Sequence, residues 1–136
     1  MRSVFLAAAA MTLLAGCAPA DIARSSCESI MLATGDPWSC TVKADVVGRS
    51  SSISFTTESR NQVADVNFEL RVAKGSLRVS YHDLTGEQHV VVTPSEPAKV
   101  SMKTKLNPNG RSFTMYFEPV GGTVEGLAGT VKYLTP

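Results

Sequence analysis

The sequence lacks an excess of charge of either sign, and its only long apolar run lies near the N-terminus. It contains 13 Lys and Arg against 12 Asp and Glu, a formal net charge of +1. Nucleic-acid-binding domains usually carry a basic stripe and a high pI, so we expect no nucleic-acid partner. The apolar run covers residues 4–14, about half of the roughly 20 residues that a membrane-spanning helix needs.

Motifs of common catalytic centres are also missing. No Gly-x-Ser-x-Gly nucleophile elbow occurs. The Gly121-Gly122 pair lies between expected strands and lacks the Lys-Ser or Lys-Thr that completes a phosphate-binding loop. Paired carboxylates for glycoside hydrolysis stay open, because their meeting depends on tertiary structure. We expect no catalytic residue and no cofactor, and an enzyme with an unrecognised site stays as an alternative.

Residues 1–16 have the composition of a signal peptide, with a basic residue before the apolar run. The run ends in Leu14-Ala15-Gly16-Cys17, which resembles the lipobox of bacterial lipoproteins. The resemblance covers only this segment. It implies cleavage before Cys17, a diacylglycerol on its sulfur and often a fatty acid, such as palmitate, on the new amino group. The alternative is an ordinary signal peptide followed by an incidental cysteine.

The lipobox resemblance also implies a location and a domain organisation. The protein is expected in the cell membrane or the outer membrane, lipid-anchored, with its domain outside the cytoplasm. Ala18, rather than Asp, follows the lipidated Cys17, which favours the outer membrane in enterobacteria-like cells. Residues 17–25 then form the lipidated cysteine and a short tether, and residues 26–136 form one domain. Two or three acyl chains suffice for stable anchoring.

Cys27 and Cys40 are the two cysteines that remain after lipidation of Cys17. In an oxidising compartment a pair of thiols usually forms a disulfide. A metal or redox pair is the alternative, but the spacing is not Cys-x-x-Cys and no histidine lies between them. We expect a Cys27–Cys40 disulfide.

A short helix is predicted at the start of the domain. The segment from Ser25 to Glu28 matches a capping box, and Gly35 stands where a helix would stop. We expect a helix over residues 26–33.

From Cys40 onwards the hydrophobic pattern changes to a period of two, which is typical of strands with one buried face. The clearest apolar positions are Val42, Ala44, Ile53, Phe55, Val66, Phe68, Leu70, Leu77, Val79, Tyr81, Val90, Val92, Val100, Met102, Phe113, Met115, Phe117, Val131 and Tyr133. About eight strands, separated by turn residues, predict an all-β domain. Its expected form is a single antiparallel β-sandwich or small barrel.

Asn109-Gly110 is a candidate two-residue turn. It would form a hairpin in which Met102 faces Phe117 and every inward residue meets another inward residue.

Thr85-Gly86 is a second candidate turn, and it would place His82 opposite His89. Cross-strand β-carbons lie about 4.5–5.5 Å apart, so the two imidazoles could share a divalent metal. A turn starting at Asp83 would shift this register by one residue. We expect no metal and regard both histidines as exposed polar residues, with the metal site as the alternative.

Lys99, Lys103 and Lys105 project from one face of their strand, and the first hairpin would place Lys103 beside Tyr116. Such a surface could bind an anionic glycan, a lipid headgroup or an acidic protein. The alternative is that these lysines protect the strand against edge-to-edge pairing.

Trp38 lies two residues before Cys40. Its ring could stack on a sugar, but we favour a role in covering the disulfide at the end of the core.

These features together predict a non-catalytic binding or structural accessory module of the cell envelope. Its membrane contact is the N-terminal lipid, and its expected partner is an envelope protein or a glycan. A small inhibitor of a lysozyme or protease is the main alternative, for which residues 121–126 are the candidate loop.

Overall fold

The computed structural model describes residues 23–29, 38–57 and 60–135. Every regular element in these ranges is a β-strand. The strands are β1 (Arg24–Ser29), β2 (Trp38–Val47), β3 (Ser51–Thr56), β4 (Val63–Arg71), β5 (Lys74–Asp83), β6 (Gly86–Val92), β7 (Ala98–Lys105) and β8 (Ser112–Leu134). Within these ranges no helix is long and apolar enough to cross a membrane.

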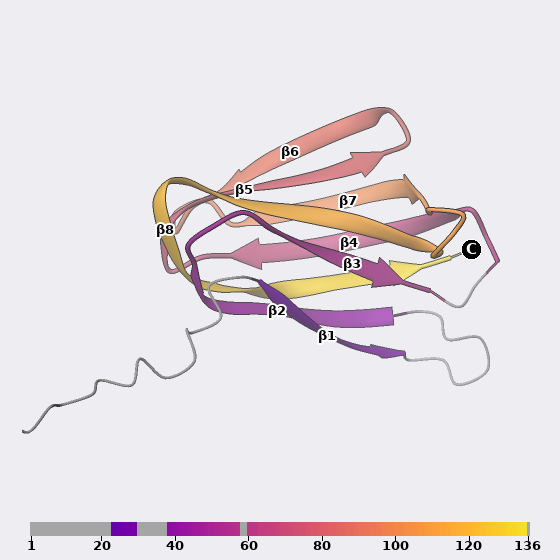
Figure 1. Cartoon of the computed structure of the whole chain (residues 1–136), viewed down its shortest axis with the longest axis horizontal. Coiled ribbons are helices and arrows are strands. Elements are labelled where there is room, and N and C mark those ends of the chain that lie inside the picture. Colours follow the sequence, from indigo (N-terminus) through magenta and orange to yellow (C-terminus); the bar gives the residue numbers. More distant parts are fainter. Residues whose placement is uncertain (1–22, 30–37, 58–59, 136) are drawn as a thin grey trace, which may run out of the picture.

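The eight strands pair in antiparallel fashion and form two layers (Figure 1). One layer has the order β1-β2-β8-β4-β7. The other contains β3, the first half of β8, β5 and β6. The prediction of an all-β antiparallel sandwich is therefore confirmed.

Strand β8 joins the two layers because it bends in its middle. Its first half pairs with β3 and β5, and its second half pairs with β2 and β4. Gly121 and Gly126 have φ angles of 73° and 68° in this bend, a left-handed conformation that suits glycine. The candidate inhibitor loop at residues 121–126 is thus part of β8 rather than a loop between strands.

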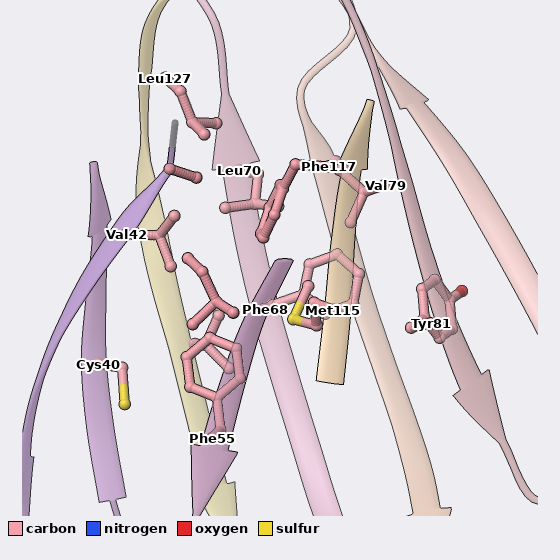
Figure 2. Close-up of a cluster of buried hydrophobic side chains, with 14 of the residues drawn as sticks. Cys40, Val42, Phe55, Phe68, Leu70, Val79, Tyr81, Met115, Phe117 and Leu127 are labelled. Atoms are coloured by element: carbon pink, nitrogen blue, oxygen red, sulfur yellow. The ribbon is translucent and has the colours of Figure 1, made fainter. Parts of the chain in front are cut away.

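The core fills the space between the layers, as period-two burial requires. Figure 2 shows Phe68 and Leu70 of β4 meeting Met115 and Phe117 of β8, and all four are almost fully buried. Burying a side chain of this size contributes about 1.5–3 kcal/mol. The apolar residues of the sequence pattern therefore hold the two layers together.

The prediction of an N-terminal helix over residues 26–33 is wrong for residues 26–29, the part of it that the structure describes. Residues 24–29 form β1, which also includes the last two residues of the predicted tether, and residues 30–33 lie outside the described residues. Cys27 lies directly opposite Cys40, with 4.0 Å between their Cα atoms, and the two form the expected disulfide. Pairing with β2 along the whole of β1 outweighs the local capping signal.

Because consecutive strands run up and down, the sandwich has two ends. Ala23 lies at one end and is buried, and its N–H donates a hydrogen bond to the Ser51 hydroxyl at 3.4 Å. The bend of β8 is at this same end, which we call the Ala23 end. The segment between β7 and β8 lies at the opposite end, near the C-terminus (Figure 1), and we call it the Asn107 end.

Candidate functional site

A seam opens between β7 and the first residues of β8. Strand β5 pairs with β8 up to the pair Ser80 and Tyr116. Beyond this pair, towards the Asn107 end, β5 approaches β7 instead. There the Thr104 hydroxyl donates to the carbonyl oxygen of His82 at 2.7 Å. An N–H from the β5–β6 turn donates to the carbonyl oxygen of Lys103 at 3.1 Å. As a result, residues 112–115 of β8 pair with β3 alone.

The seam contains a groove of about 330 Å³, which we call the seam groove. It is lined by His82, Met102, Thr104, Lys105, Leu106, Asn107, Pro108, Ser112, Phe113, Thr114 and Tyr116. The apolar part of its floor comes from Met102, which is half-buried, and from the edges of the buried Leu106 and Phe113. Polar groups make up about as much of the groove surface as apolar groups.

Tyr116 is the most prominent side chain on the rim, with 47% of its surface exposed. It lies in a row across four strands, between Ser52 of β3 and Ser80 of β5, with His89 of β6 next to Ser80. Neighbouring strands are about 4.8 Å apart, and serine is too short to cover an aromatic ring over that distance. The phenol ring is therefore open to a ligand, and its hydroxyl can hydrogen-bond.

Tyr116 and the lysines of β7 belong to different layers, so the prediction that Lys103 neighbours Tyr116 is wrong. Strand β7 pairs with β4, and Lys103 lies opposite Asp65. The expected two-residue turn at Asn109-Gly110 does not form. Asn107 instead closes a longer loop, donating its N–H to the carbonyl oxygen of Ser112 at 2.8 Å. This loop carries the chain from one layer to the other.

The same pairing changes the meaning of the lysine stripe. Lys99 lies 3.3 Å from the carboxylate of Glu69, and Lys103 lies 3.3 Å from that of Asp65. Both pairs are exposed, and such ion pairs contribute only about 0–1 kcal/mol. Lys105 faces Val63 instead and lines the seam groove. The structure thus separates Lys105 from the other two lysines.

His82 and His89 do not face one another, so their predicted register is wrong. The turn residues are Leu84 and Thr85, and His82 lies opposite Glu87. The reason is local: the carboxylate of Asp83 accepts hydrogen bonds from the N–H and the hydroxyl of Thr85, at 2.8 and 2.6 Å, which fixes where the turn begins. No group of three metal-ligating side chains occurs in the described part of the chain.

Trp38 packs against the core, and its role in covering the disulfide stays a prediction. Its ring stacks on Tyr133, with 6.3 Å between the ring centroids and 14° between the planes. The ring is half-buried, and Nε1 has no hydrogen-bonding partner among the described residues. Cys17 lies outside the described residues.

A second hollow, of about 350 Å³, lies over β4, β7 and β8 near the Ala23 end. No aromatic residue lines it, and its charged lining includes the paired Lys99 and Glu69. The seam groove has the open aromatic ring that this hollow lacks, so we take the seam groove and Tyr116 as the candidate site.

Comparisons with known proteins assign no family. No protein-family model matches the sequence, and no curated protein matches it. Solved structures with some likeness include the capsular polysaccharide assembling protein CapF from Staphylococcus aureus, with 8% identity and a TM-score of 0.41 over 74% of this chain. The chain spans only 23% of that protein.

Two smaller proteins resemble the chain over most of their length. The CBM22-1 xylan-binding domain of Paenibacillus barcinonensis Xyn10C has 16% identity and a TM-score of 0.40, covering 82% of this chain and 80% of its own. A disulfide-linked pilus protein of Bacillus endospore appendages has 11% identity and a TM-score of 0.42, covering 84% and 87%. Similarities this low assign neither a ligand nor an activity to this chain.

Proposed function

We propose that this protein is a lipid-anchored, non-catalytic binding module of the cell envelope, and that the seam groove with Tyr116 is its binding surface. The anchor is proposed from the likeness of Leu14-Ala15-Gly16-Cys17 to a lipobox. The binding surface is proposed from one observation above all: an aromatic ring stands exposed beside a groove lined by both apolar and polar side chains.

The distance between anchor and domain supports this arrangement. Ala23 is buried in the sandwich and follows Cys17 by only six residues. At most about 3.6 Å per residue, this segment spans no more than about 22 Å. Lipid on Cys17 would therefore hold the Ala23 end close to the bilayer. The seam groove is at the Asn107 end and would point away from the membrane, towards the rest of the envelope.

The groove residues favour binding over chemistry. His82 lines the groove together with Ser112 and Thr114, but no hydrogen bond joins its ring to either hydroxyl in the described structure. A nucleophilic hydroxyl needs such an adjacent base. The groove instead suits a ligand that has both apolar and hydroxylated faces, as a glycan has. The ring of Tyr116 and the apolar floor would contact the apolar faces, and Ser112 and Thr114 could hydrogen-bond to the hydroxyl groups.

The anchor is tested by Cys17→Ser in the native host, with Ala18→Ser as the matched control. The unchanged protein and the control should incorporate radiolabelled palmitate and partition into the detergent phase of Triton X-114. Cys17→Ser should do neither. Labelling or partitioning of Cys17→Ser equal to that of the control would rule out the lipid anchor.

The binding surface is tested by photo-crosslinking in intact cells. A benzoylphenylalanine is introduced at position 116, and at position 91 in a second variant. Val91 is a suitable comparison because it is 41% exposed and lies on β6, outside the groove. Crosslinks to an envelope component from position 116 and not from 91 are expected. Equal yields from the two positions, or none from 116, would contradict the proposed surface.

A further inference from the structure

We infer that the seam groove binds a linear polysaccharide whose sugars carry carboxylates, with Tyr116 contacting a sugar ring and Lys105 a carboxylate. This inference rests on the proposed binding function and names the ligand class for the same site. Two features carry it: the position of Lys105 and a neighbouring hollow that Lys105 also lines.

Lys105 differs from the other lysines of β7 in what lies across the strand pair. Lys99 and Lys103 each have a carboxylate 3.3 Å away on β4. Lys105 is paired in register with Val63, and no ion pair involves it in the described structure. Lys105 is exposed and lines the groove. It is thus available to an external anion, and a hydrogen bond to a charged group contributes about 1.5–3 kcal/mol.

Another hollow of about 330 Å³ lies beside the seam groove at the Asn107 end. Lys105, Asn107 and Pro108 line both of them, so the two are adjacent. Arg60 also lines this hollow and adds positive charge beside Lys105. No carboxylate occurs among the described residues that line either hollow. A chain of several units, bearing negative charges, fits these two adjacent hollows better than a single small molecule.

The lining favours sugars as these units. Met102 and Phe113 provide an apolar floor, and Ser112 and Thr114 place hydroxyl groups beside it. The ring of Tyr116 stands at the edge with nearly half of its surface open. Apolar ring faces would lie against the floor and the phenol, and sugar hydroxyls would meet the protein hydroxyls.

An acidic peptide is the competing ligand, and the strand edges argue against it. A peptide that adds to a sheet needs a free edge, and strands are typically 5–6 residues long. Only residues 113–115 of β8 lack a partner on the groove side, since Asn107 bonds to the Ser112 carbonyl oxygen and β5 takes over at Tyr116. On the other wall, β5 and its turn already bond to β7 through Thr104 and Lys103. The free edge is therefore too short for a strand.

The test measures binding by isothermal titration calorimetry, using the full-length lipidated protein in detergent micelles. The probes are octasaccharides of hyaluronan, alginate and polygalacturonate. Each is compared with its carboxyl-reduced form, which keeps the chain and loses the charge. Hexaglutamate is the peptide probe. At least one acidic octasaccharide should bind, and its reduced form should bind about tenfold more weakly, the equivalent of one charge-assisted contact. Added salt should narrow this difference.

Variants separate the two contacts. Lys105→Ala should remove the preference for the acidic form, whereas Lys103→Ala should leave it unchanged, because that lysine is already paired with Asp65. Tyr116→Ala should weaken binding of both forms about tenfold or more, and Tyr116→Phe should retain most of it. All three side chains are on the surface, and equal thermal unfolding midpoints would confirm that each of the four variants is folded.

Failure of the ligand assignment can be told from failure of the binding function. Equal binding of acidic and reduced sugars would overturn the carboxylate assignment, and a preference that survives Lys105→Ala would overturn the role of Lys105. Either result would leave Tyr116-dependent binding intact. Binding of hexaglutamate alone would identify an acidic peptide as the ligand instead. No binding of any octasaccharide, combined with crosslinks from position 116 in cells, would overturn the polysaccharide and keep the surface. No binding and no crosslinks would overturn both.

Discussion

The Cys27–Cys40 disulfide should supply a large share of the stability of the fold. The two cysteines are separated by 13 positions, so the bond closes a loop of about 14 residues. In the chain-entropy model, closing such a loop stabilises the folded state by about 3 kcal/mol. Cys27→Ser removes the bond with little other damage, because Cys27 is exposed and Cys40 stays as a buried thiol. The expected loss is therefore about 3 kcal/mol, or roughly 12 °C in the unfolding midpoint.

Urea unfolding followed by tryptophan fluorescence measures this loss. Trp38 is the single tryptophan and starts β2 in contact with Tyr133, so its emission reports on the strand that carries the disulfide. Ser26→Ala, at an exposed neighbouring position of β1, is the control and should change stability by less than about 0.5 kcal/mol. Reduction of the unchanged protein should reproduce the effect of Cys27→Ser. A loss below about 1 kcal/mol would refute the loop-closure reasoning.

Two further predictions concern the sheet and its turns. Gly129→Ala should destabilise the protein by about 3 kcal/mol, because an added Cβ would overlap the backbone carbonyl oxygen of Glu69. In the same urea assay Gly110→Ala should change the free energy of unfolding by less than about 0.5 kcal/mol, because the atom nearest to an added Cβ is 3.4 Å away. Equal losses of stability in the two variants would refute the reasoning. The hydrogen bond from the Thr85 hydroxyl, with those of nearby backbone N–H groups, lowers the pKa of Asp83 below 3.8. A carboxyl whose pKa is lower in the folded state than in the unfolded state stabilises the fold at any pH above the unfolded-state pKa. This contribution should disappear as pH falls through the folded-state pKa. An NMR titration of the Asp83 carboxyl checks it, and a pKa at or above 3.8 would contradict it.

The sequence by itself determined which residues lie inside the sandwich. Alternation along each strand places every second side chain on the same face, so Phe68 and Leu70, or Met115 and Phe117, could be assigned to the core without knowing their partners. The disulfide could also be predicted, because an expected lipid on Cys17 and an expected location outside the cytoplasm leave only one intramolecular pairing for the other two cysteines. Both conclusions depend on local pattern or on simple counting.

The tertiary structure decided which strands are neighbours, and therefore what the surface residues do. Tyr116 lies beside Ser52, which is 64 positions away, and Lys103 beside Asp65 rather than Tyr116. A period of two gives the buried face of a strand but not its partner, so the loop after Asn107 could not be recognised as a crossing between layers. Pairing with β2 likewise turned a predicted helix into β1. The seam groove exists only because strands distant in sequence separate at one place, and no local pattern encodes that separation.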